Sequence, residues 1–196
     1  MVRICAASKV SEQPKSIVEV PMTETVCGSV RPAVPASESL PKAKGRVVFD
    51  PQWCRTCRVC EVACSIAKEG QARPSVARIN ILFDEFATVD PISATICFQC
   101  EDAPCMAACR VGAMTRDART GAVVILQEKC VGCMRCQKAC PWGIPKQHPD
   151  RREALKCDLC SDRESGPLCV EMCPLSGKAL RYEPDYYIRG NGDGKL

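Results

Sequence analysis

The chain has 196 residues, with 18 cysteines, 15 prolines and an aromatic content of only 5%, which is too little apolar bulk for a large conventional core. Its formal net charge of +4 counts every cysteine as a neutral thiol, and Lys and Arg are interspersed with Asp and Glu, so the charge pattern excludes a concentrated basic surface and predicts no nucleic-acid binding. No apolar stretch approaches the length of a membrane span, and the N-terminus has no export signal, so we expect a cytoplasmic protein.

The first segment, residues 1–45, is rich in proline, with five prolines among Ser, Thr, Val and Ala. Such a composition does not favour folding in isolation. Two interpretations stay open: a flexible tail, or an extended arm that docks on a partner or on another copy of this chain. Cys5 and Cys27 lie in this segment without ligand spacing around them, and we predict that they are free thiols.

The other 16 cysteines fall into four groups within residues 46–185, which we expect to form one domain followed by a tail, 186–196. The groups are Cys54, Cys57, Cys60, Cys64; Cys97, Cys100, Cys105, Cys109; Cys130, Cys133, Cys136, Cys140; and Cys157, Cys160, Cys169, Cys173. The third group is followed by Pro141, so residues 130–141 have the C-x2-C-x2-C-x3-C-P motif with which bacterial ferredoxins bind [4Fe-4S] clusters. Four such groups predict four [4Fe-4S] clusters.

Two other uses of cysteine were weighed. Structural zinc also uses C-x2-C pairs, but it needs only two pairs and has no use for a third cysteine at the same spacing. A disulfide framework would require an oxidising compartment and normally an export signal. The spacing therefore favours clusters, and because their binding free energy contributes to folding, we expect the metal-free chain to fold poorly.

Short strands indicate how the groups pair. Residues 47–49 and 123–125 are β-branched or aromatic, and each stretch precedes a cysteine group. Residues 111–115 are separated from 123–125 by polar turn residues, which predicts a hairpin between groups two and three. Residues 177–182 have no group after them, so their expected partner is 47–49. The predicted fold is therefore small and α+β, with an outer unit (46–96 with 150–185) nested around an inner unit (97–149).

In two-cluster ferredoxins the fourth cysteine of each run ligates the other cluster. Applied to the nested pairing, this rule gives four ligand sets, which we number in order. Site I is Cys54, Cys57, Cys60 and Cys173; site II is Cys157, Cys160, Cys169 and Cys64; site III is Cys97, Cys100, Cys105 and Cys140; site IV is Cys130, Cys133, Cys136 and Cys109.

From about Val47 to Tyr182 the chain resembles the four-cluster ferredoxin-like electron-transfer subunits of larger redox enzymes. The longer gaps, Cys100-x4-Cys105 and Cys160-x8-Cys169, are similar to those in subunits of dimethyl sulfoxide reductase-like enzymes, formate hydrogenlyase and carbon monoxide-linked hydrogenases. The stretches 47–51, 58–64, 74–79 and 155–160 look most like the iron-sulfur subunit beside tungsten-containing aldehyde oxidoreductases, which implies an anaerobic system and a tungstopterin-containing catalytic partner.

The chain departs from the ferredoxin pattern at two places. Ser65 and Arg110 stand where a proline usually follows the fourth cysteine, whereas Pro141 and Pro174 keep the pattern. Because proline lacks an N–H, we expect the hydrogen bonding around Cys64 and Cys109 to differ.

Catalytic chemistry of its own is not expected. The chain has one histidine and no Gly-rich phosphate-binding loop, so it lacks the usual nucleophile sets and nucleotide motifs. We therefore expect a non-catalytic electron-transfer subunit of an aldehyde oxidoreductase. The alternatives are the same subunit of a hydrogenase, carbon monoxide dehydrogenase or molybdopterin reductase, or a free-standing polyferredoxin.

Overall fold

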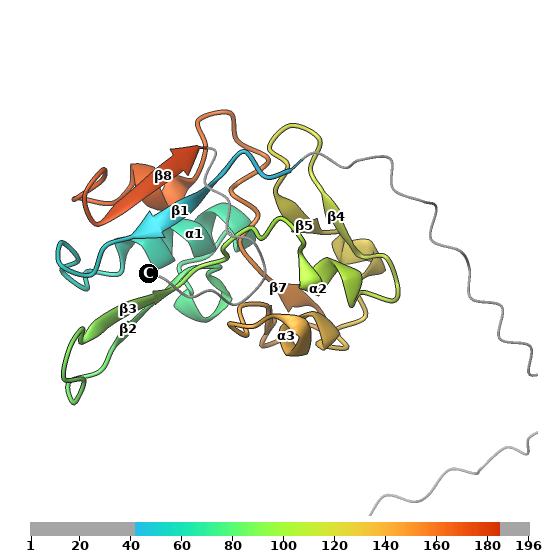
Figure 1. Ribbon diagram of the computed structural model, residues 1–196, viewed down its shortest axis with the longest axis horizontal. Coiled ribbons are helices and arrows are strands. Elements are labelled where there is room, and N and C mark those ends of the chain that lie inside the picture. The colour runs from blue at the N-terminus through green and yellow to red at the C-terminus, as the bar shows by residue number, and fades with distance from the viewer. Residues whose placement is uncertain (1–41, 185–196) are drawn as a thin grey trace, which may run out of the picture. The chain divides into compact units, whose positions relative to one another are not determined.

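The computed structural model describes residues 42–184 (Figure 1). Most of the predicted arm, with Cys5 and Cys27, and the predicted tail lie outside these residues. In chain order the elements are β1 (Gly45–Phe49), α1 (Val59–Glu69), η1 (Pro74–Val76), β2 (Asn80–Phe83), β3 (Ile92–Thr95), α2 (Pro104–Ala107), β4 (Met114–Arg116), β5 (Val123–Ile125), η2 (Gln127–Lys129), α3 (Arg135–Ala139), β6 (Lys146–Gln147), β7 (Ala154–Leu155), α4 (Leu168–Glu171) and β8 (Leu180–Pro184). Among these helices, none is long and apolar enough to cross a membrane.

The strands form four separate antiparallel pairs rather than one sheet. β1 pairs with β8, with Val47 opposite Tyr182, and β4 pairs with β5, with Thr115 opposite Val124. These are the pairings expected from the sequence, and they make a small α+β fold. Strands this short form no extended sheet against which a core could pack. The described loops and helices must therefore be held together by other contacts.

Two of the expected strands begin later than predicted. The residues before β8 form a turn in which the Gly177 N–H donates to the Leu180 carbonyl at 2.8 Å, and Gly177 has a φ of 81°. The residues before β4 are similarly interrupted by Gly112, whose φ is 62°. Glycine adopts such angles without a Cβ clash, which favours a turn over a strand.

Two hairpins were not predicted: β2 with β3, and β6 with β7. In the first, Ile81 is buried while Leu82 and Phe83 are exposed, and Asp90 and Pro91 precede β3. In Figure 1 this hairpin projects away from the other elements.

The largest group of packed buried side chains lies beside β1, β8, α1 and α4. It contains eleven buried residues: Val47, Cys60, Cys64, Ala77, Ile79, Ile81, Ile96, Ala122, Leu159, Cys169 and Leu180. A second group beside α2, α3 and β4 contains three: Met114, Cys136 and Ala154. Cysteines belong to both groups, so the core and the predicted ligands occupy the same places.

Candidate metal-cluster site

Each cysteine run is a loop with left-handed backbone at a matching position. The third residue of each run has positive φ: Thr56 at 52°, Gln99 at 53°, Gly132 at 64° and Leu159 at 56°. Three of these four are not glycine, and a non-glycine residue in this region costs roughly 1 kcal/mol or more. The loops therefore hold a strained conformation, which turns the flanking thiols toward a common centre.

Four helical regions carry the fourth cysteine of each run, which the predicted ligand sets assign to the site of the paired run. Each helical region carries two cysteines four residues apart: Cys60 and Cys64 on α1, and Cys169 and Cys173 on and just after α4. α2 and α3 do the same with Cys105 and Cys109, and with Cys136 and Cys140. Residues four apart lie on one helix face, one turn from each other, and α1 packs against α4 while α2 packs against α3. Each helix can therefore present one thiol to each of two neighbouring sites.

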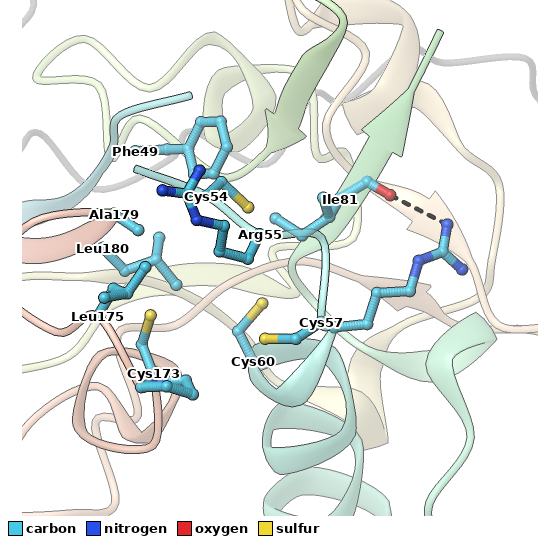
Figure 2. Close-up of a pocket in the computed structure, with 12 residues that line it drawn as sticks. Phe49, Cys54, Arg55, Cys57, Cys60, Ile81, Cys173, Leu175, Ala179 and Leu180 are labelled. Atoms are coloured by element: carbon cyan, nitrogen blue, oxygen red, sulfur yellow. Dashed lines mark hydrogen bonds between the residues drawn. The ribbon is translucent and has the colours of Figure 1, made fainter. Parts of the chain in front are cut away.

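The four cysteines of site I line one cavity of about 330 Å³. In Figure 2 the sulfur atoms of Cys54, Cys57, Cys60 and Cys173 point toward the same space. Phe49 and Leu180 supply apolar lining. Cys173 comes from a helix that is more than a hundred residues away in sequence, and the structure brings it to the loop that carries the other three.

The three other predicted sets are brought together in the same way. Cys64, Cys157, Cys160 and Cys169 line a second cavity; Cys97, Cys100, Cys105 and Cys140 line a third; and Cys109, Cys130, Cys133 and Cys136 line a fourth. Nowhere within residues 42–184 are three His, Cys, Asp or Glu side chains arranged to hold a single metal ion. Four thiols spread around an apolar cavity are instead the donor set of a [4Fe-4S] cluster. Ligation itself stays a prediction.

Backbone N–H groups donate to several of the sulfurs. The Arg78 N–H lies 3.2 Å from Cys64 Sγ, and the Ala113 N–H lies 3.3 Å from Cys109 Sγ. Cys64 and Cys109 are the fourth cysteines of the two runs that lack the usual following proline, and each sulfur accepts an N–H from a residue beyond its own helix. Hydrogen bonds to sulfur are one of the protein's means of setting the reduction potential of a cluster.

Burial raises the pKa of many of these thiols. For Cys60 the pKa rises to about 12, first because of desolvation and then because of the nearby charge of Glu61. Desolvation is also the first cause for Cys100 and Cys136, whose pKa values rise to about 11. Without metal these thiols are therefore neutral at physiological pH, and cluster binding has to displace their protons.

Buried charges differ between sites I and III. Beside site I, the carboxylate of Glu61 is only 2% exposed, and its Oε1 accepts the Ile81 N–H at 2.6 Å. Beside site III, Lys156 is 5% exposed, and its ammonium donates to the carbonyls of Val123 and Cys157. Arg116, also buried, donates to the Cys100 carbonyl at 3.0 Å. The ion pairs of the described residues include none of these three side chains.

These buried charges were missed in the sequence. Lys156 and Glu61 each adjoin a cysteine in the sequence, and that adjacency is the signal that could have identified them. It was insufficient because a charged residue beside a ligand usually points to solvent.

The four sites follow one another in a row. Sites I and II share α1 and α4, and sites III and IV share α2 and α3. Sites II and III adjoin, because Gln99 in the loop of site III donates from its Nε2 to the Cys157 carbonyl at 2.8 Å. Of the sixteen described cysteines, only Cys57 and Cys133 are exposed. Cys57 belongs to site I and Cys133 to site IV, so the row has one exposed cysteine residue at each end.

Comparison with known proteins agrees with this chemistry. Residues 90–182 match the family model of the 4Fe-4S dicluster domain. The polyferredoxin-like subunit of aliphatic sulfonate oxidoreductase from Pyrococcus furiosus is 39% identical over 131 residues, which cover 67% of this chain and 72% of that subunit. Electron transport protein HydN of Escherichia coli K12 is 38% identical over 150 residues, covering 65% and 82% of the two chains. Formate hydrogenlyase subunit 2 of the same bacterium is 33% identical over 168 residues, covering 68% and 79%.

These relatives share much of their length with this chain, and the matched residues contain three of the four cysteine groups even in the domain model alone. The chain therefore belongs to the family of ferredoxin-like electron transport proteins that carry the 4Fe-4S dicluster domain.

Proposed function

We propose that this chain binds four [4Fe-4S] clusters at sites I to IV and serves as the non-catalytic electron-transfer subunit of an oxidoreductase complex. The four cysteine sets around four cavities support the cluster count. Each cluster, when bound, takes up or releases one electron. The chain's own residues fix the ligands, exclude water by burial and set the local charge.

The observation that carries the proposal is the row of sites with its two exposed ends. A carrier that only stores electrons needs a single accessible site. A relay needs one accessible site for the donor and another for the acceptor, and the exposed residues Cys57 and Cys133 belong to opposite ends of the row. This arrangement favours a relay between two partners.

For the partner we propose a tungstopterin-containing aldehyde oxidoreductase, supported by the sequence stretches 47–51, 58–64, 74–79 and 155–160. Two of the three relatives are named as subunits of an oxidoreductase and of a hydrogenlyase, the third is named only as an electron transport protein, and none of the names mentions tungsten or aldehydes. A hydrogenase-type catalytic subunit is therefore the second candidate, favoured by the formate hydrogenlyase relative.

The predicted domain organisation belongs to the same proposal. The outer unit, 46–96 with 150–185, would hold sites I and II, and the inner unit, 97–149, would supply all eight ligands of sites III and IV. We propose the cytoplasm as the compartment, because sixteen thiols require a reducing environment. We also propose that residues 1–45 dock on the catalytic subunit or on another copy of this chain; deleting residues 1–40 should then reduce the size of the assembly, and an unchanged elution volume would contradict this role.

Elemental analysis of the complex, purified without oxygen from its native host, tests the proposal. We expect roughly 16 irons per copy of this chain from four clusters of four, together with tungsten in a large subunit. Nickel in place of tungsten would assign the chain to a hydrogenase or carbon monoxide dehydrogenase, and molybdenum to a molybdopterin reductase. Iron without any large subunit would indicate a free-standing polyferredoxin, and zinc in place of iron would overturn the cluster proposal.

A further inference from the structure

The hairpin of β2 and β3 carries a concentration of apolar side chains that the described part of the protein does not cover. Phe86 and Val89, in the turn between the strands, are each 84% exposed, and Leu82 and Phe83 on β2 are 51% and 60% exposed. Single exposed apolar residues are ordinary, but several on one projecting element mark an interaction surface. Figure 1 shows that this hairpin extends beyond the body formed by β1, β8 and α1.

The hairpin has an ordered tip. The Asp84 N–H donates to the Pro91 carbonyl at 2.8 Å, and the Phe86 N–H donates to Asp84 Oδ1 at 3.0 Å. The Asp84 carbonyl also accepts the Ala87 N–H at 3.2 Å. These bonds fix the turn, so Phe86 and Val89 are presented in a defined arrangement, and binding through them costs less conformational entropy than binding through a flexible loop.

The charge of the hairpin is of one sign. Residues 80–95 contain Asp84, Glu85 and Asp90 and no Lys or Arg. All three acids are exposed, and the described ion pairs do not involve them. An apolar tip with an acidic border is complementary to an apolar groove with a basic rim.

The base of the hairpin is attached directly to site I. The Ile81 N–H donates to the buried Glu61, and the Ile81 carbonyl accepts a bond from Arg58 Nη2 at 3.3 Å (Figure 2). Arg58 lies between Cys57 and Cys60 in the ligand loop. A partner that holds the hairpin therefore lies next to the exposed residue Cys57 at the site I end of the row.

We propose that the β2–β3 hairpin is the docking arm for the catalytic subunit, that it inserts into an apolar groove bordered by Lys and Arg on that subunit, and that site I is the end of the row that serves this subunit. The inference rests on the proposed function, because it requires a stable protein partner. It leaves the Cys133 end free for a second partner.

The test uses the native complex. The chromosomal copy is replaced by tagged variants, and the large subunit is released from the wild-type complex by high salt and purified. Binding of this subunit is then measured for the holo wild type, for Phe86→Ser/Val89→Ser and for Glu85→Lys/Asp90→Lys. Ile66→Ser is the matched apolar control, since Ile66 is 49% exposed on α1 and lines none of the cavities described above, and Glu128→Lys/Glu164→Lys is the matched charge control.

We expect the apolar double variant to bind at least about tenfold more weakly, because two central anchors are lost. The charge-reversal variant should also bind more weakly, with a larger loss at low salt than at high salt. Both controls should bind as the wild type does, and all variants should keep the wild-type iron content. Hydrogen exchange should show protection of residues 80–95 when the large subunit is added.

Three results separate the possible failures. Equal binding by the hairpin variants and the controls would overturn the docking arm but leave the electron-transfer function intact. Protection centred on the Cys130–Cys136 loop would place the catalytic subunit at the opposite end of the row. A wild-type chain that is purified with its clusters but without any large subunit would overturn both the docking arm and the role as a subunit.

Discussion

Sites I and III have the same predicted ligand types and the same left-handed loop position, but the charged side chains buried beside them are of opposite sign. Site I lies beside the buried carboxylate of Glu61, whereas site III lies beside the buried cations Lys156 and Arg116. The ligands alone therefore do not determine the redox properties of a site in this fold. Adding an electron makes a cluster more negative, so the cations favour reduction at site III and the carboxylate opposes it at site I.

The two sides of the described chain also differ in how much core they have without metal. Apart from the predicted ligands, eight buried side chains pack beside β1 and β8, and two pack beside β4 and α3. Apolar burial contributes to stability in proportion to area. The side with β4 and β5 should therefore depend more strongly on its clusters.

Removal of all clusters has the largest expected effect. With the metal chelated under reducing conditions, we expect the amides of β4 and β5 to exchange rapidly, while those of β1 and β8 keep part of their protection. Hydrogen exchange followed by mass spectrometry measures this difference. Uniform loss of protection across both pairs would show that the larger core does not persist without metal.

Substitution of a single cysteine tests whether sites I and II have separate ligand sets. Cys60 and Cys64 lie four residues apart on α1, yet they line different cavities. We expect Cys60→Ser to disturb the cluster of site I and Cys64→Ser that of site II, each with loss of up to about four of roughly 16 irons. Electron paramagnetic resonance distinguishes the two, and the same signal lost in both variants would contradict the crossed ligand sets.

Neutralising Lys156 should lower the potential of site III. A unit charge at about 7 Å in an effective dielectric of about 20 contributes about 2.4 kcal/mol, which corresponds to about 100 mV for one electron. Lys156 lines the site III cavity together with Cys105; burial raises the pKa of Cys105, and the nearby Lys156 charge opposes that rise. A redox titration of Lys156→Met should show one reduction step shifted down, and Lys156→Arg should leave it near its wild-type position.

Neutralising Glu61 should have the smallest effect, with the opposite sign. Glu61→Gln keeps an oxygen that accepts the Ile81 N–H, so the hairpin base should be preserved. The charge of Lys146 already interacts with Glu61, so we expect the potential of site I to rise by less than the shift at site III. A downward shift in this variant would contradict the electrostatic difference between the two sites.

The cysteine spacing predicted which thiols would meet, because ligand loops and helices impose local geometry that can be read from intervals of two and three residues. All four expected sets gather around common cavities. The pairing of β1 with β8 was also predictable, since the strand after the last group had one remaining partner. The sets follow from the cysteine spacing together with the nested strand pairing and the ferredoxin crossing rule; that these thiols ligate clusters stays a prediction.

The hairpin of β2 and β3 and the buried charges could not be predicted from spacing. Phe83 and Phe86 look like core residues in the sequence, yet both are exposed. Glu61 and Lys156 look like surface residues, yet both are buried. Burial of a charged side chain depends on partners far along the chain: the Ile81 N–H for Glu61 and the Val123 carbonyl for Lys156.

The pairing of β1 with β8 sets an order for biosynthesis. The last predicted ligands of sites III and IV to be made are Cys140 and Cys136, whereas those of sites I and II are Cys173 and Cys169. β1 can pair with β8 only once residues 180–184 have been made. A nascent chain can therefore complete the inner pair of sites while the ribosome is still making the outer pair's last ligands. Until Cys173 has been made, the loop of Cys54, Cys57 and Cys60 lacks its fourth predicted ligand. We therefore expect a host that produces this protein to need cluster delivery and protection from oxygen until translation ends.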